Sequence, residues 1–205
     1  IINENPDLLN ILVIDCGIKN SQLRSLLKHN VQLTVVNTTY NFLPEIMDKQ
    51  YDGIFLSNGP GDPQSSSFVV KQLKTIFESN INIPIFGICY GHQLVGLASG
   101  NSIGKMKYGN RGHNIPCNLV GTKKCYITSQ NHGYEVILNQ NQSQWQPLFI
   151  NSNDNSNEGL IHLDKPFFSV QFHPEARAGP TDTVFLFNIF IERCKSTFNV
   201  RDKIY

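Results

Sequence analysis

The chain has 205 residues, 17 of them Lys or Arg and 16 Asp or Glu, and this length suits one domain that folds without disulfide or metal support. Because the two signs of charge nearly balance, a nucleic-acid partner is not expected, and because no apolar run approaches roughly 18 residues, neither is a membrane span. Five cysteines without a CxxC pair favour a reducing compartment, so we expect a cytoplasmic protein that shows no export signal.

The first half of the sequence alternates apolar runs with amphipathic stretches, a pattern typical of βαβ units around a mainly parallel sheet. The predicted strands are Ile11–Asp15, Gln32–Val36, Gly53–Ser57 and Ile83–Ile88. The predicted helices are Asn20–His29, Ser66–Ser79 and Gly91–Ser99. The last of these strands is apolar on both faces, which indicates a central position with helices above and below. The predicted fold class is therefore α/β, with an open, mainly parallel central sheet flanked by helices.

Beyond residue 100 the pattern changes to short strands and turns, which predicts a smaller antiparallel addition in the second half. Candidate strands lie at Lys124–Thr128, Glu158–His162 and Phe167–Phe172. The segment Asn139–Asn157 is rich in Asn, Gln and Ser but includes several apolar residues, so we interpret it as an ordered loop with a mobile tip. Pro180–Lys195 is predicted to form the last helix, with an apolar side that belongs to the core.

The segment Gly87-Ile88-Cys89-Tyr90-Gly91 has the features of a nucleophile elbow, with Cys in place of Ser. It follows a buried strand and precedes a helix, and its two glycines let strand and helix approach closely at a sharp turn. The unpaired N–H groups and the dipole of a helix N-terminus favour a reactive thiolate. The alternative is a small buried cysteine without chemical function; the glycines and the preceding strand favour the nucleophile.

The segment His173-Pro174-Glu175 comes directly after a predicted strand. An imidazole at the strand end can act as general acid and base for a cysteine, and a carboxylate two residues on can fix its tautomer. Together with Cys89, these residues predict acyl transfer through a thioester. A zinc site built from Cys89, His92, His132 and His173 is the competing interpretation, but their spacing matches none of the usual zinc patterns, so no metal is expected.

The loop Ser57-Asn58-Gly59-Pro60-Gly61-Asp62-Pro63 follows the third predicted strand. Two glycines between prolines indicate a stiff loop with exposed backbone N–H groups, although a plain tight turn is the alternative. We predict that the N–H groups of Gly59 and Tyr90 form an oxyanion hole. Residues 100–105 come nearest to a phosphate-binding loop but are one residue short of GxxxxGK[ST], so ATP chemistry is expected elsewhere.

Three motifs, NGPGDP at Asn58–Pro63, GICYGHQL at Gly87–Leu94 and HPE at His173–Glu175, resemble those of the class I, triad-type glutamine amidotransferases. KMKYGNRGHNIPC from Lys105, TSQNHGY from Thr128 and FFSVQFHPEARAGPTDT from Phe167 are similar to the glutaminase part of carbamoyl phosphate synthetase, specifically of the eukaryotic pyrimidine-synthesis type. The similarity runs through nearly the whole chain.

The resemblance implies that Cys89, His173 and Glu175 form a catalytic triad. It also implies a group of residues that bind glutamine or its oxyanion: Gly59, Gly61, Tyr90 through its backbone amide, Gln93, Asn131, Gly133 and Tyr134. The implied reaction hydrolyses L-glutamine and delivers ammonia to a carbamoyl phosphate synthetase, which uses ATP and bicarbonate. No cofactor is expected in residues 1–205 themselves, which are interpreted as a single glutaminase domain of a larger polypeptide or complex.

The family's glutaminase part normally begins with an N-terminal subdomain that is not in this sequence, so part of the glutamine pocket and of the synthetase contact is expected outside it. A relative that uses free ammonia has Ser at the elbow, so Cys89 favours glutamine-dependent chemistry, in pyrimidine synthesis or in a urea-linked form. Two other functions remain open: a Cys-His-Glu hydrolase of another γ-glutamyl or peptide substrate, and a catalytically silent regulatory module.

Overall fold

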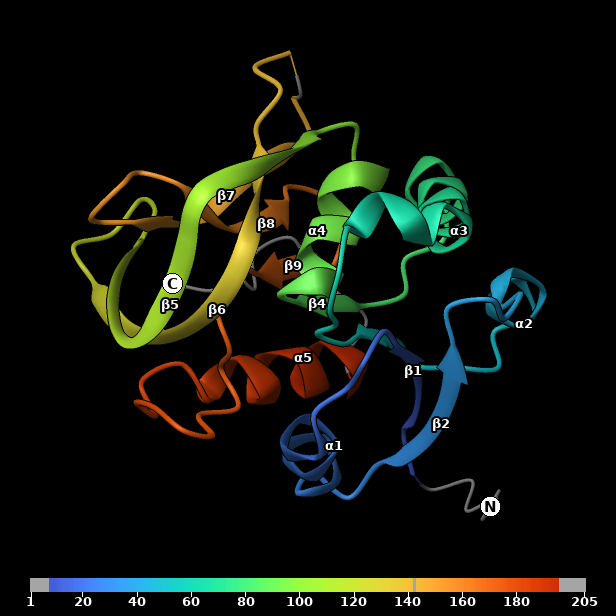
Figure 1. Ribbon diagram of the computed structural model, residues 1–205. Helices are drawn as coiled ribbons and strands as arrows, with labels where there is room; N and C mark the ends of the chain where they lie inside the picture. Colours follow the sequence, from blue (N-terminus) through green and yellow to red (C-terminus); the bar gives the residue numbers. More distant parts are fainter. Residues whose placement is uncertain (1–7, 142, 196–205) are drawn as a thin grey trace.

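Parallel strands form one half of the sheet in the computed structural model, which describes residues 8–141 and 143–195 (Figure 1). Within these residues the sheet has nine strands in the order β2-β1-β3-β4-β9-β8-β6-β5-β7. The parallel strands are β2 (Gln32–Asn37), β1 (Asn10–Asp15), β3 (Gly53–Leu56), β4 (Ile85–Ile88) and β9 (Phe167–Val170). Strands β3, β4 and β9 are buried along their whole length, because helices cover both faces of the parallel half.

The helices divide between the two faces of the parallel strands. Helices α1 (Asn20–Leu27) and α5 (Phe185–Lys195) contribute to one hydrophobic cluster. Helices α2 (Leu43–Met47), α3 (Ser67–Glu78) and α4 (Tyr90–Ala98) contribute to the other, and a 3₁₀ turn, η1 (Pro63–Ser66), precedes α3. Figure 1 shows α1 and α5 together below the sheet and α3 and α4 above it. The α/β prediction, with helices on both faces of parallel strands, is confirmed.

The antiparallel half consists of β5 (Ser102–Leu119), β6 (Cys125–Ile137), β7 (Trp145–Asn151) and β8 (Asn157–His162). Strand β8 pairs with β9 and so joins this half to the parallel strands. Because β7 also pairs with β8, the four strands close on themselves in a ring. The sequence did not predict this closure, which depends on pairing between strands that are distant in the chain.

Four elements were absent from the sequence prediction: α2, the 3₁₀ turn η1, β5 and β7. Strand β7 lies in Asn139–Asn157, which was wrongly interpreted as a loop throughout; Gln142 within that segment lies outside the described residues. Proline is disfavoured inside strands, but Pro147 sits beside a register shift, where it is tolerated. Much of β5 is exposed, so it lacks the apolar alternation that identifies strands, and its pairing with β6 supplies the regular structure instead.

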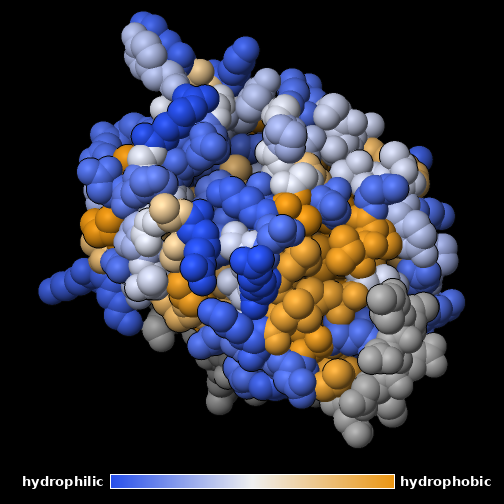
Figure 2. Space-filling view, turned by 60° about the horizontal axis from the view of Figure 1, so that its bottom comes forward, coloured by the Kyte–Doolittle hydropathy of each residue, from blue (hydrophilic) through white to orange (hydrophobic). Residues whose placement is uncertain are grey.

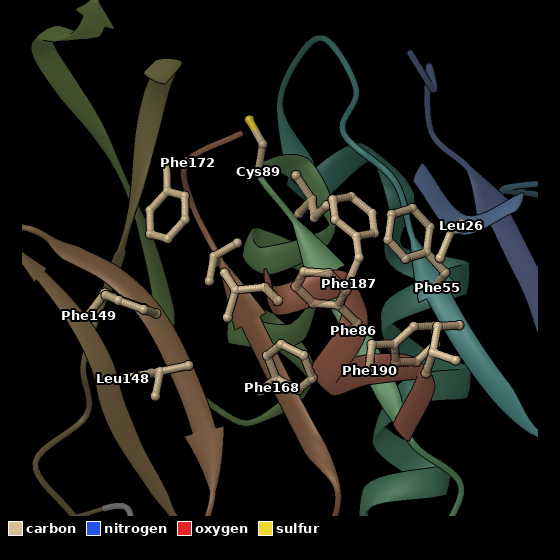
Figure 3. Packing of buried hydrophobic residues seen from close by; sticks show 14 of the residues in the cluster. Leu26, Phe55, Phe86, Cys89, Leu148, Phe149, Phe168, Phe172, Phe187 and Phe190 are labelled. Atoms are coloured by element: carbon tan, nitrogen blue, oxygen red, sulfur yellow. The ribbon is translucent and has the colours of Figure 1, made fainter. Parts of the chain in front are cut away.

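An aromatic cluster beneath the end of β4 supports the elbow (Figure 3). The rings of Phe86 and Phe168 stack with their centroids 4.5 Å apart, and Phe55 meets Phe86 edge-on at 5.6 Å. All three are fully buried, and each contributes about 2–3 kcal/mol through burial. The segment that carries Cys89 therefore starts from a densely packed part of the core.

The outer surface includes apolar as well as polar areas. Figure 2, turned so that the bottom of Figure 1 comes forward, shows apolar residues gathered beside a polar region. Exposed apolar side chains include Leu27 of α1 and Val35 of β2. In residues 8–141 and 143–195, no helix combines the length and the hydrophobicity that crossing a membrane requires.

Candidate active site

Cys89 occupies a strained turn between β4 and α4. Its φ of 54° and ψ of −101° lie where residues other than glycine are uncommon. A methyl group at Gly87 would meet the Gly91 carbonyl oxygen at 2.7 Å, and one at Gly91 would overlap the Leu56 carbonyl of β3. Both glycines are therefore required by the close approach of β4, α4 and β3, as the motif predicted.

Backbone hydrogen bonds hold this turn against two neighbouring strands. The Cys89 N–H donates to the Val170 carbonyl of β9 at 2.8 Å, and the Gly91 N–H donates to the Ser57 carbonyl beyond β3 at 3.0 Å. The Cys89 sulfur lies 3.9 Å from the Asn131 carbonyl oxygen of β6. In Figure 3 the sulfur points away from the aromatic cluster, on the side where the parallel strands have their carboxyl ends. Packing thus presents the thiol at the edge of the sheet.

His173 and Glu175 reach the same edge because β9 lies next to β4. The carboxyl ends of neighbouring parallel strands meet on one side of a sheet, and His173 follows β9 as Cys89 follows β4. The His173 backbone N–H donates to the Ser129 carbonyl at 2.8 Å, and its Nδ1 lies 2.9 Å from Glu175 Oε1. With Nδ1 donating to the carboxylate, Nε2 is the nitrogen available to the Cys89 thiol.

His173 and Glu175 each stabilise the charged form of the other. Burial alone would lower the pKa of His173, but hydrogen bonds to Cys89 and Glu175 raise it to about 9. Burial alone would raise the pKa of Glu175, but His173, with a smaller contribution from Lys19, lowers it. At neutral pH the arrangement therefore favours a protonated imidazole between the Glu175 carboxylate and the sulfur of Cys89.

Lys19 is a residue of the site that sequence reasoning missed. Its Nζ lies 3.5 Å from Glu175 Oε1 and 3.3 Å from His173 Nδ1, and its side chain is 40% exposed. Lys19 comes shortly after β1, so it also stands at the carboxyl end of a parallel strand. That position was the available signal, because ligand-binding residues gather at this edge in open α/β sheets.

The predicted oxyanion loop is fixed by side-chain hydrogen bonds to the loop after β1. Ser57 Oγ accepts from the Cys16 N–H at 2.9 Å, and Asn58 Oδ1 accepts from the Lys19 N–H at 3.1 Å. A methyl group at Gly59 would overlap the Cys16 carbonyl. These contacts make the loop rigid, and they require glycine at position 59.

Tyr90 braces the next part of the same loop. Its hydroxyl lies 2.9 Å from Ser66 Oγ and 3.2 Å from Ser65 Oγ, and it donates to the Asp62 carbonyl at 3.2 Å. The side chain is buried against η1, which leaves its backbone N–H, in the first turn of α4, as the group predicted to face an oxyanion. The ring therefore connects the elbow to the loop that follows β3.

A cavity of about 700 Å³ lies over the thiol. Most of the predicted site residues line it: Cys89, His173, Gly59, Gly61, Gln93, Asn131, Gly133 and Tyr134. Glu175 is buried behind His173 rather than in the wall. The cavity also has basic side chains that sequence reasoning did not assign, namely Lys19, Lys105, Lys107 and Arg111. The last three belong to β5, the strand that the sequence did not predict.

Two further histidines of the motifs are buried and held neutral. Burial lowers the pKa of His92 to about 3 and that of His132 to about 4. His92 Nδ1 lies 2.9 Å from Ser169 Oγ of β9. In the part of the chain that the structure describes, no group of three or more His, Cys, Asp or Glu side chains is arranged so that it could hold a metal ion.

The chain matches the family model described as glutamine amidotransferase class-I over residues 12–193. It is 50% identical to multifunctional protein ura1 of Schizosaccharomyces pombe over 95% of this chain and 8% of that protein. It is 52% identical to the arginine-specific small chain of carbamoyl phosphate synthase of Debaryomyces hansenii, over 90% of this chain and 42% of that one. The chain therefore spans less than half the length of either relative.

The fold is also similar to that of a crystal structure described as a glutamine amidotransferase from Thermotoga maritima. The TM-score is 0.63 at 18% identity, with 94% of this chain and 87% of that chain covered. This likeness concerns the arrangement of strands and helices. The family match over residues 12–193 goes further, and by it the chain belongs to the class I glutamine amidotransferases.

Proposed function

We propose that this chain hydrolyses the side-chain amide of L-glutamine to glutamate and ammonia. The observation that supports this most directly is Cys89 on a strained turn, under a cavity and hydrogen-bonded to a buried His173–Glu175 pair. Such a set can form and break an acyl bond to sulfur. Membership of the amidotransferase family points to glutamine as the acyl donor.

In the first half of the proposed reaction, the Cys89 thiolate attacks the amide carbon and a tetrahedral intermediate forms. The backbone N–H groups of Gly59 and Tyr90 stabilise the negative oxygen. Protonated His173 transfers its proton to the amide nitrogen, the C–N bond breaks and ammonia leaves. The product of this half is a γ-glutamyl thioester on Cys89.

In the second half, neutral His173 removes a proton from water as the water attacks the thioester carbon. The C–S bond then breaks, glutamate leaves and the thiolate is regenerated beside protonated His173. Glu175 keeps the imidazole in one tautomer in both halves. In the binding step, Gln93, Asn131, Gly133 and Tyr134 contact the substrate from the walls, and Gly61 lets the loop approach it.

We further propose that the ammonia is delivered to a carbamoyl phosphate synthetase, on the same polypeptide or in a complex, for pyrimidine synthesis. This proposal is supported by about 50% identity to a multifunctional protein and to a carbamoyl phosphate synthase small chain. ATP and bicarbonate then act at the synthetase, and this chain, as a single glutaminase domain in the cytoplasm, needs no cofactor of its own.

Glutamate release from L-glutamine tests the proposal in the complete natural polypeptide, with and without bicarbonate and ATP. Wild type should release glutamate, and a chloroketone analogue of glutamine should form one covalent adduct with it, on Cys89. Cys89→Ser should do neither. Faster turnover of a γ-glutamyl amide or a peptide would point to another hydrolase, and no adduct with any of these would point to a catalytically silent module.

A further inference from the structure

A second group of polar side chains lies behind the wall of the cavity, between β6, β8, β9 and α4. At its centre is Glu158 of β8, which is completely buried. The Gln171 backbone N–H donates to the Glu158 carbonyl at 2.9 Å. Directly opposed residues of antiparallel strands point to the same face, so the two side chains lie side by side.

One side of this group supports the β6 wall of the cavity. His132 Nδ1 donates to the Tyr134 carbonyl at 2.8 Å, while its Nε2 lies 2.9 Å from Gln130 Oε1 and 3.8 Å from Glu158 Oε1. The residues on either side of His132, Asn131 and Gly133, line the cavity. The position of His132 therefore sets the position of this wall.

The other side of the group supports the α4 wall. Gln93, which lines the cavity, donates through Nε2 to Gln171 Oε1 at 3.1 Å and to the Tyr134 carbonyl at 3.2 Å. The Gln93 amide therefore bridges α4 to β6 and to the end of β9. Through Gln171 and His132, Glu158 stands between both walls of the same cavity.

Two atoms at the centre of the group have unused hydrogen-bonding capacity. Among the described residues, neither Glu158 Oε2 nor Gln171 Nε2 has a hydrogen-bond partner, and both atoms are buried. Unpaired polar groups are unfavourable in a buried position, so a purely structural role would favour apolar residues here. Burial raises the pKa of Glu158 to about 8, so the carboxyl group is mostly protonated at neutral pH and has the polarity of an amide.

We propose that Glu158 is a positioning residue that holds the two walls of the substrate cavity in register through His132 and Gln171. Its loss weakens substrate binding more than it slows the chemical step, because the triad has its own supports in β4 and β9. The proposal rests on the proposed glutaminase function. If the proposal is correct, loss of the Glu158 side chain raises KM for L-glutamine, an effect that is not expected of a residue that only fills the core.

Steady-state glutaminase kinetics of Glu158→Ala and Glu158→Gln, in the complete natural polypeptide, test this role. Glu158→Ala should raise KM for L-glutamine at least tenfold while kcat stays within about threefold of wild type. Glu158→Gln, which copies the neutral carboxyl group in size and polarity, should restore KM to within about threefold. Glu135→Gln is the matched control, since it removes a half-buried carboxylate from β6 outside this group, and its KM should equal that of wild type.

Alkylation of Cys89 separates positioning from general loss of structure. Iodoacetamide, which needs no glutamine site, should react with Glu158→Ala and wild type at similar rates. For a chloroketone analogue of glutamine, the concentration that gives half of the maximal alkylation rate should be at least tenfold higher in Glu158→Ala than in wild type. Equal half-saturation would overturn the proposal, as would a fall in kcat at constant KM.

If Glu158→Ala does not fold, Glu158→Asp withdraws the carboxyl group by one methylene and should still raise KM at least threefold. An unchanged KM in that variant overturns the proposal. If wild type does not release glutamate from L-glutamine, the proposed function fails. If wild type is active and the Glu158 variants have the same KM as wild type, only the inference about Glu158 fails.

Discussion

Gly87 and Ser169 are directly paired in the parallel ladder of β4 and β9. Because the two strands run in the same direction and end together, Cys89 and His173 emerge at one edge of the sheet although 84 residues of sequence separate them. The catalytic pair therefore depends on a strand order that places β9 beside β4, and the hydrogen bond between Cys89 and His173 follows from it.

The unfolding free energy should depend on pH through His173. Its folded pKa of about 9 lies above its ordinary value of 6.5, so the contribution is complete below about pH 6.5 and is lost as pH rises through 9. We expect wild type to lose about 1–3 kcal/mol over this window relative to His173→Asn. Urea unfolding at about pH 6 and about pH 9.5 measures this difference. If the unfolding free energy changes equally in the two proteins between these pH values, the prediction is contradicted.

Substitution of either elbow glycine should damage both folding and activity. An added methyl group in Gly91→Ala meets the β3 backbone, which has no flexible side chain to move aside, so we expect a loss of about 1–3 kcal/mol in unfolding free energy. Gly112→Ala is the control, since its nearest neighbour would be a side-chain atom at 3.3 Å. Thermal unfolding and glutaminase assays of both variants measure the effect. Equal stability of the two would mean that β3 and α4 are not in tight contact.

Loss of the carboxylate charge at position 175 should slow the chemical step. Glu175→Gln keeps the size of the side chain but removes the charge that orients and supports protonated His173. We expect kcat to fall about 10²–10⁴-fold with KM changed little. Steady-state kinetics with L-glutamine measure the two constants. A change confined to KM would show that Glu175 acts in binding instead.

The oxyanion loop should tolerate no side chain at position 59. In Gly59→Ala the new methyl group would overlap the Cys16 carbonyl, so the loop must shift and its N–H must leave the oxyanion. We expect kcat to fall by about a hundredfold or more. Gln64→Ala, an exposed position in the following turn, is the control and should keep wild-type kcat. If both variants keep it, the Gly59 N–H does not stabilise the oxyanion.

Several features of the site could be predicted because their determinants are local in the chain. The elbow around Cys89 needs only a buried strand, a turn with two glycines and a helix, all within a short segment. His173 and Glu175 are two residues apart, so their hydrogen bond follows from one turn. Strands β1, β3 and β4 were recognised because burial makes them almost continuously apolar. The assignment of Phe167–Phe172 to the antiparallel addition was wrong, because this segment forms β9, which pairs parallel with β4.

Other features were settled only by the tertiary structure. Strand β5 is largely exposed and therefore lacks an apolar pattern, and β7 contains Pro147, a residue that is uncommon inside strands. Both form because β6 and β8 supply hydrogen-bond partners. Lys19 and Glu158 belong to no motif recognised in the sequence, and Arg111 lies in a recognised motif but was given no role in the site. These residues reach the cavity or its wall only through pairing between strands that are distant in the chain. Local propensity thus determined the nucleophile and its helpers, while strand order determined what surrounds them, because pairing energies depend on partners that no short segment of sequence contains.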